Sequence, residues 1–124
     1  MAGPKCEEDL FCGINLAKSQ SSEEMSDLEK KHTPVISVSG TPKEGEAFEV
    51  SVKVGEYLAH PNEHGHFIAW IELYSEDTFI GRVDFASERA APTAVFTVTL
   101  NHLHELRALA HCNMHGTWKG TKEL

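Results

Sequence analysis

The stretch FEVSVKV, residues 48–54, decides how this sequence folds. Apolar and polar residues alternate through it, which is the pattern of a β-strand with one face buried and one face in water. Gly55 follows directly, and the turn-forming residues 41–45, Thr-Pro-Lys-Glu-Gly, come before it. We therefore predict a half-buried strand here, and the neighbouring sequence should supply strands for it to pair with.

Short β-strand patterns lie on both sides of this stretch, separated by turns. Residues 67–74 are nearly continuously apolar, as expected for a strand covered on both faces. No segment shows sustained helical periodicity. The sequence therefore predicts an all-β sandwich or barrel. The other expected strands are residues 35–38, 79–85, 96–100 and 106–112, with the last of these as the final strand.

Composition limits the function classes. The formal charge is −8 over 124 residues. This argues against a basic face of the kind that binds nucleic acid or an anionic membrane surface. We expect no nucleic acid and no membrane among its partners. The N-terminus has no apolar run long enough for a signal peptide, and no transmembrane stretch follows. A cytoplasmic location is therefore expected.

Residues 1–27 differ in composition from the rest, because they include the polar run SQSSEE at residues 19–24. We predict a flexible, mobile N-terminal extension over 1–27 and a single β domain over 28–124. Cys6 and Cys12 lie in this extension, and their spacing is wrong for a metal knuckle. Three cysteines make no disulfide framework, so we expect these two to be free thiols in a reducing compartment.

Chemistry concentrates near the C-terminus, in the stretch CNMHGTW at residues 112–118. The thiolate of Cys112 and the imidazole of His115 can bind one metal ion together, but two ligands do not fill a coordination sphere. His32, His60 and His66 lie in turn-rich positions, and loops at one end of a sandwich can converge. Imidazoles with one thiolate suit a first-row transition metal. Cys112 could otherwise be a buried thiol or a nucleophile.

The remaining histidines have simpler interpretations. His64, His102 and His104 lie in polar surroundings and are expected at the surface. His111 shares a strand face with Leu109 and is expected to be packed. The two tryptophans, residues 70 and 118, are expected in the core or at its rim.

Four segments together resemble superoxide reductase, the neelaredoxin and desulfoferrodoxin iron domain, over about residues 28–120. They are KHTP at 31–34, HPN at 60–62, His66 followed by IAWI at 68–71, and CNMHGTW at 112–118. The resemblance implies an immunoglobulin-like β-sandwich of about seven strands. It also implies one mononuclear non-haem Fe(2+)/Fe(3+) per chain. The implied equatorial ligands are His32, His60, His66 and His115, and the implied axial ligand is Cys112.

The resemblance also implies an activity, the one-electron reduction of superoxide to hydrogen peroxide. Lys31 matches the family's catalytic lysine, which attracts the anion and orders water for proton delivery. The implied partners are superoxide as substrate and a rubredoxin-type or other electron-donor protein. Family members also lead us to expect a homodimer or homotetramer.

The chain departs from the family pattern at one place. Members of the family usually have Glu-Lys-His at the first motif, with the glutamate in the sixth position of resting ferric iron. Here the order is Glu29-Lys30-Lys31-His32. Either Lys30 replaces the glutamate, or one lysine is inserted and Glu29 reaches round. We favour replacement or a weakened role, because the residues from His32 onward keep the register of the family.

Two other metalloproteins compete with this interpretation. A cupredoxin-like electron-transfer protein also places a late cysteine and histidine in one loop of a β-sandwich, but it uses only two histidines. A zinc-binding structural module could use Cys112, His115 and two other histidines. It would leave Lys31 and the additional histidines unexplained.

Overall fold

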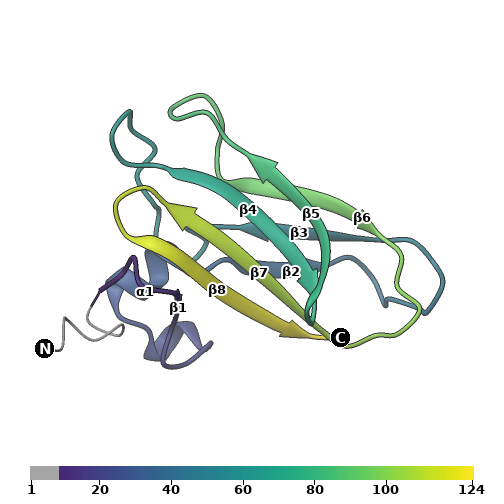
Figure 1. Ribbon diagram of the computed structural model, residues 1–124. Helices are drawn as coiled ribbons and strands as arrows, with labels where there is room; N and C mark the ends of the chain where they lie inside the picture. Colours follow the sequence, from purple (N-terminus) through teal and green to yellow (C-terminus); the bar gives the residue numbers. More distant parts are fainter. Residues whose placement is uncertain (1–8) are drawn as a thin grey trace, which may run out of the picture.

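The computed structural model describes residues 9–124, which form two facing β-sheets (Figure 1). Within these residues, a five-stranded sheet has the order β1-β8-β7-β4-β5 and a three-stranded sheet the order β2-β3-β6. The predicted all-β sandwich is confirmed. In chain order the elements are β1 (Ile14–Leu16), a 3₁₀ turn (Ser22–Glu24), α1 (Asp27–His32), β2 (Val35–Val38), β3 (Phe48–Lys53), β4 (Ile68–Ser75), β5 (Thr78–Asp84), β6 (Thr93–Val98), β7 (Glu105–Cys112) and β8 (Gly116–Glu123).

The stretch that predicted the fold is β3, the middle strand of the smaller sheet. It pairs antiparallel with β2 on one side and β6 on the other. Its alternation is realised as expected, with Phe48, Val50 and Val52 buried and Glu49 and Lys53 exposed. The buried side chains meet those of the larger sheet. The core between the sheets contains Ile36, Phe48, Val50, Val52, Val54, Ile68, Ile71, Leu73, Ala94, Val98, Leu106, Ala108, Ala110 and Cys112.

Strand β4 is central in its sheet, but only one of its faces is fully buried. Ile71 and Leu73 point into the core, whereas Trp70 and Tyr74 on the opposite face are half-buried. The prediction that residues 67–74 are covered on both faces is therefore wrong. The apolar residues on the outer face, Trp70 and Tyr74, are instead partly covered by neighbouring side chains of the same sheet.

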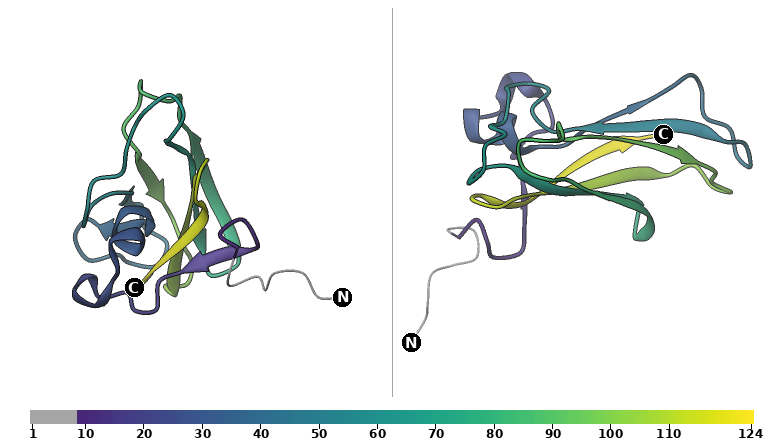
Figure 2. Two further views of the ribbon diagram at one scale, coloured as in Figure 1. Left: turned by 90° about the vertical axis from the view of Figure 1, so that its left-hand side faces the viewer. Right: turned by 90° about the horizontal axis from the view of Figure 1, so that it is seen from above.

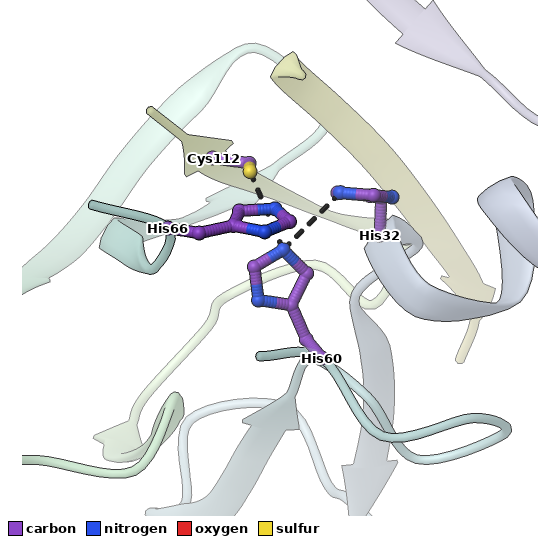
Figure 3. Close-up of side chains that lie close together, drawn as sticks. All are labelled: His32, His60, His66 and Cys112. Carbon is purple, nitrogen blue, oxygen red and sulfur yellow. Dashed lines mark hydrogen bonds between the residues drawn. The ribbon is translucent and has the colours of Figure 1, made fainter. Parts of the chain in front are cut away.

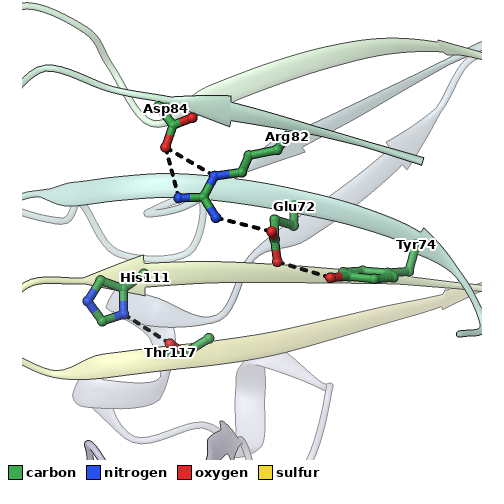
Figure 4. Close-up of polar contacts among 6 residues, drawn as sticks. All are labelled: Glu72, Tyr74, Arg82, Asp84, His111 and Thr117. Carbon is green, nitrogen blue, oxygen red and sulfur yellow. Dashed lines mark hydrogen bonds and ion pairs between the residues drawn. The ribbon is translucent and has the colours of Figure 1, made fainter. Parts of the chain in front are cut away.

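An ion-pair network covers this outer face (Figure 4). The Arg82 guanidinium donates to Glu72 at 3.2 Å and to Asp84 at 2.9 Å, and it lies 4.6 Å from the centre of the Trp70 ring. The hydroxyl of Tyr74 donates to Glu72 at 3.1 Å. Together these contacts shield the aromatic rings from water without a second layer of structure.

The final strand is β8, so the prediction that residues 106–112 form the last strand is wrong. These residues form β7 in extended conformation, and the chain then turns back antiparallel over residues 116–123. The alternation of apolar and polar residues is not visible in the sequence of β8, because two of its three buried positions are glycines: Gly116, Trp118 and Gly120. A side chain at Gly120 would overlap the carbonyl oxygen of Pro34, so the close approach of the two segments requires glycine there.

Part of the predicted N-terminal extension packs onto the sandwich. Strand β1, which the polar composition did not indicate, pairs parallel with β8 at the edge of the larger sheet. Cys12 is disulfide-bonded, so the expectation of a free thiol is wrong for this residue. A turn holds its backbone, with the Cys12 amide 3.0 Å from the Asp9 carbonyl oxygen. Cys6 lies outside the described residues, and the domain boundary at residue 27 stays a prediction.

A short helix, α1, closes one end of the sandwich (Figure 2). It begins at a capping box in which the Ser26 hydroxyl accepts from the Glu29 amide and the Glu29 carboxylate accepts from the Ser26 amide. A helix of six residues is too short to show a helical periodicity of apolar residues, so the sequence did not predict α1. Within residues 9–124 there is no helix with the length and apolar content that a membrane crossing needs.

Candidate metal centre

The first histidine of the site, His32, is the last residue of α1. Its side chain is 2% exposed. Its Nδ1 lies 2.7 Å from the carbonyl oxygen of Leu28, one turn earlier in the helix. That bond assigns the ring proton to Nδ1 and leaves Nε2 as an unprotonated acceptor. The helix thus presents a bare nitrogen to the end of the sandwich.

His60 is oriented in the same way by the loop that carries it. Its Nδ1 lies 2.6 Å from the carbonyl oxygen of Pro61, so this ring also holds its proton on Nδ1. Its Nε2 lies 3.2 Å from His32 Nε2 and 3.3 Å from Cys112 Sγ (Figure 3). Two unprotonated nitrogens at this distance repel each other unless a proton or a metal ion lies between them.

His66 supplies a third nitrogen. Its Nε2 is buried and makes no hydrogen bond to the part of the chain that the structure describes. An unpaired buried polar atom is costly, and a metal ion bound at this nitrogen would remove that cost. The ligand atoms of His32, His60, His66 and Cys112 all lie within 4.8 Å of one another. One ion could contact all four.

Cys112 ends β7 and is fully buried as a free thiol. Burial raises the pKa of this thiol, and the backbone N–H groups of Met114 and His115 partly oppose that rise. A thiolate at this place therefore needs a further positive charge. A bound metal cation would supply it.

His115 joins the group from the loop after Cys112. Its Nδ1 lies 3.7 Å from the Cys112 sulfur. Its ring centre is 4.8 Å from that of His32 and 5.0 Å from that of His66. His115 is half-buried, as are His60 and His66, whereas His32 and Cys112 are buried.

Burial favours the neutral form of three of these imidazoles. With a smaller contribution from the neighbouring imidazoles, it lowers the pKa of His32 and of His60 to about 4. Burial also lowers the pKa of His115, and the charge of Lys31 acts in the same direction on His60 and His115. At neutral pH the rings of His32, His60 and His115 are therefore uncharged, as metal ligation requires. The Lys31 ammonium lies near enough to be felt at two of them.

The donor set favours a redox-active transition metal over the two rival sites. Four imidazoles and one thiolate exceed the two histidines of a blue-copper site and the four ligands of a structural zinc site. Iron accepts both nitrogen and thiolate ligands at this number. The residues therefore fit a mononuclear iron centre.

Comparison with known proteins agrees with this geometry. The family model described as desulfoferrodoxin matches residues 24–121. The chain belongs to the desulfoferrodoxin family. The match includes all five candidate donor residues and both sheets except β1 and the last residues of β8.

Relatives match over most of their length. A protein of Methanocaldococcus jannaschii is 41% identical over 117 residues, which are 92% of this chain and 95% of that protein. The superoxide reductase of Pyrococcus abyssi is 41% identical over 104 residues, 77% of this chain and 88% of its own. The solved structure of superoxide reductase (neelaredoxin) from Ignicoccus hospitalis is 35% identical, with a TM-score of 0.74, covering 90% of this chain and 93% of that chain.

The other histidines lie away from the group. His64, His102 and His104 are exposed, and His104 Nδ1 lies 3.5 Å from Glu76. His111 follows the sequence prediction of a packed residue, since its ring stacks on Trp70 at 5.5 Å on the outer face of the sheet. The alternation along β7 turns it away from Cys112, its neighbour in the chain.

The structure also shows where Glu29 lies. One carboxylate oxygen accepts the Ser26 amide at 2.8 Å, and the other accepts the Lys18 amide at 2.9 Å. These bonds lower the pKa of the carboxyl and keep it ionised at the start of α1. Glu29 therefore does not reach round to the histidine group, which removes one of the two alternatives for the missing glutamate.

Two residues with structural roles in the site were not identified from the sequence. Trp118 stacks on His32 with ring centres 5.4 Å apart, and its Nε1 donates to the His115 carbonyl oxygen at 2.9 Å. Asn113 joins two ligand loops, because its side chain accepts from the Phe67 amide and donates to the Gly65 carbonyl. Both lie in the segment CNMHGTW, so their proximity to Cys112 was the available signal.

Proposed function

We propose that this chain is a superoxide reductase, which converts superoxide to hydrogen peroxide by one-electron reduction. The carrying observation is the convergence of His32, His60, His66 and Cys112, with His115 beside them, in a chain whose relatives include named superoxide reductases. These five residues would hold one iron ion. When bound there, iron supplies a ferrous/ferric couple for the electron transfer.

The residues have separable roles in this proposal. The neutral imidazoles donate nitrogen ligands without adding charge, and Cys112 adds one negative charge that tunes the potential of the ion. The carbonyl oxygens bonded to His32 and His60 hold each ring in the ligating tautomer. The buried setting of His32 and Cys112 keeps water from these two donors.

Lys31 would attract the substrate. The chain has a formal charge of −8 and repels an anion at long range, so a local positive charge near the site has a large effect on the encounter. Lys31 is half-buried and its charge is felt at His60 and His115. It is the proposed catalytic residue, placed to draw superoxide in and to order water for proton delivery.

The missing glutamate affects the resting ferric state. Glu29 is bonded to two backbone amides, and position 30 is a lysine. Neither residue offers a free carboxylate to the iron. In this proposal a water, a hydroxide or an added anion, and no carboxylate of Glu29, would complete the ligands of the iron.

The electron must come from outside the chain, since five ligands and one iron store a single electron. A rubredoxin-type or other electron-donor protein is the proposed partner, and a homodimer or homotetramer the proposed assembly. One iron per chain is proposed, in a domain over residues 28–124.

The decisive experiment follows the products. Protein purified from its own source is analysed for iron, copper and zinc, and is then given superoxide under a continuous supply of electrons. We expect iron, with hydrogen peroxide formed and no oxygen evolved beyond spontaneous dismutation. Oxygen formed together with peroxide would show a dismutase. Copper with no superoxide turnover would instead support the cupredoxin-like alternative.

A further inference from the structure

Residues 10–18, which we call the strap, run along β8 and lie outside the family match of residues 24–121. The strap includes β1, which pairs with residues 117–119 of β8. It therefore contacts the strand that follows directly from the Cys112–His115 loop (Figure 1). No role for the strap follows from the family match.

Asn15 attaches the strap beside the ligand loop. Its side-chain amide donates to the Leu10 carbonyl oxygen at 2.7 Å and to the Thr117 carbonyl oxygen at 2.9 Å. The Leu10 carbonyl packs against Gly116, where a side chain would overlap it and where φ is +82°. One amide group thus holds the strap against the residue that follows His115.

The other end of the strap attaches to α1. The Lys18 amide donates to Glu29 at 2.9 Å, and Glu29 also caps the helix through Ser26. The strap therefore connects β8 to the helix that ends in His32. Strand β8 begins directly after His115 and opposite Cys112, and α1 ends at His32. The strap therefore joins two elements that adjoin or carry three of the five proposed ligands.

Trp118 lies beneath the strap and contacts ligands on both sides. It is 4% exposed, stacks on His32 and donates to the His115 carbonyl oxygen. A groove of about 950 Å³ separates the strap from α1, and Trp118 is among its lining residues. The strap reaches Trp118 through the backbone, because Asn15 lies opposite Trp118 in the pairing of β1 with β8.

We propose that Asn15 is a positioning residue for the metal centre, which acts through Gly116 and Trp118 on the placement of His115 and His32. The inference rests on the proposed ligand set. It predicts that loss of the Asn15 amide alters the geometry of a bound metal, and not merely the stability of the fold.

The test compares Asn15→Asp with Gln20→Ala in the full-length protein. Aspartate has the shape of asparagine but cannot donate, so both strap bonds are lost. Gln20 accepts from the Thr121 amide at 3.3 Å, so its removal loosens the N-terminal segment at a point remote from the ligands. Asn15→Ala is a second variant without the added charge, and circular dichroism confirms that each variant is folded.

The readouts do not depend on superoxide. Cobalt(II) replaces iron, and the thiolate-to-cobalt absorption, the cobalt ligand-field bands and the rate of cobalt release to a chelator are recorded. For both Asn15 variants we expect shifted ligand-field bands and about tenfold faster release, the lower end of the effect of outer-shell contacts on metal affinity. Gln20→Ala should match the wild type. The midpoint potential of the iron form should move in the same two variants.

The outcomes separate the two proposals. If the wild-type protein shows the thiolate–cobalt band while folded Asn15 variants reproduce its bands and release rate, the strap inference is overturned and the ligand set stands. Equal shifts in Gln20→Ala would also overturn it, because a general loosening would then explain the effect. A wild-type protein without the thiolate band would overturn the ligand set and the strap inference together.

Discussion

The buried, neutral state of His32 gives a stability prediction with a defined sign. The pKa of His32 falls from the ordinary value of 6.5 to about 4 because burial disfavours the charged ring. As the pH falls below about 6.5, the unfolded chain binds a proton at His32 that the folded chain does not bind. The metal-free protein is therefore most stable above that pH, and the contribution of His32 is lost as the pH falls toward about 4.

The magnitude follows from these two pKa values. Between pH 7 and pH 5 the difference in proton binding at His32 lowers the free energy of unfolding by about 2 kcal/mol. Solvent screening reduces this little, because the side chain is 2% exposed. His60 acts in the same direction, but its ring is only half-buried and its contribution is smaller than the pKa alone suggests.

The assay is urea denaturation of the metal-free protein at pH 7 and at pH 5, with a chelator present. We expect His32→Gln to lose about 2 kcal/mol less than the wild type between the two values, because the other titrating groups are common to both. His104→Gln is the matched control, since it removes a histidine whose side chain is 55% exposed and not buried. If His32→Gln is as sensitive to pH as the wild type, the argument that His32 is buried in the neutral state is refuted.

Three further predictions concern the site. Cys112→Ser should abolish the sulfur-to-iron absorption and most of the activity, by about 100-fold or more, and an unchanged visible spectrum would disprove thiolate ligation. Lys31→Ala should slow the reaction with superoxide by about tenfold at low salt and weaken its dependence on ionic strength, measured by pulse radiolysis; Lys30→Ala is the control, and equal effects of both would show that Lys31 has no special position. Gly116→Ala should lower the free energy of unfolding by at least about 2 kcal/mol, because φ is +82° and the new methyl group would overlap the Leu10 carbonyl. A urea midpoint equal to that of the wild type would contradict this packing.

Local patterns predicted much of the sandwich correctly. The alternation in residues 48–54 identified β3, and similar patterns identified β2, β4, β5, β6 and β7. They failed at β8, where Gly116 and Gly120 replace apolar residues at inward positions, and at α1, which is too short to show a helical period. Strand β1 was missed because three residues paired at a sheet edge carry too little alternation to be recognised.

The sequence by itself indicated the proposed donor residues and their chemistry: a late thiolate, four histidines in the motifs of a known family, and a lysine beside the first of them. These follow from residue type and spacing, which are properties of the chain alone. Only the tertiary structure decided that Glu29 turns away to bond two backbone amides, that His111 stacks on Trp70, and that Trp118 contacts two segments carrying proposed ligands. The physical reason is that such contacts join residues distant in the chain, and strand register and loop closure determine which of them meet.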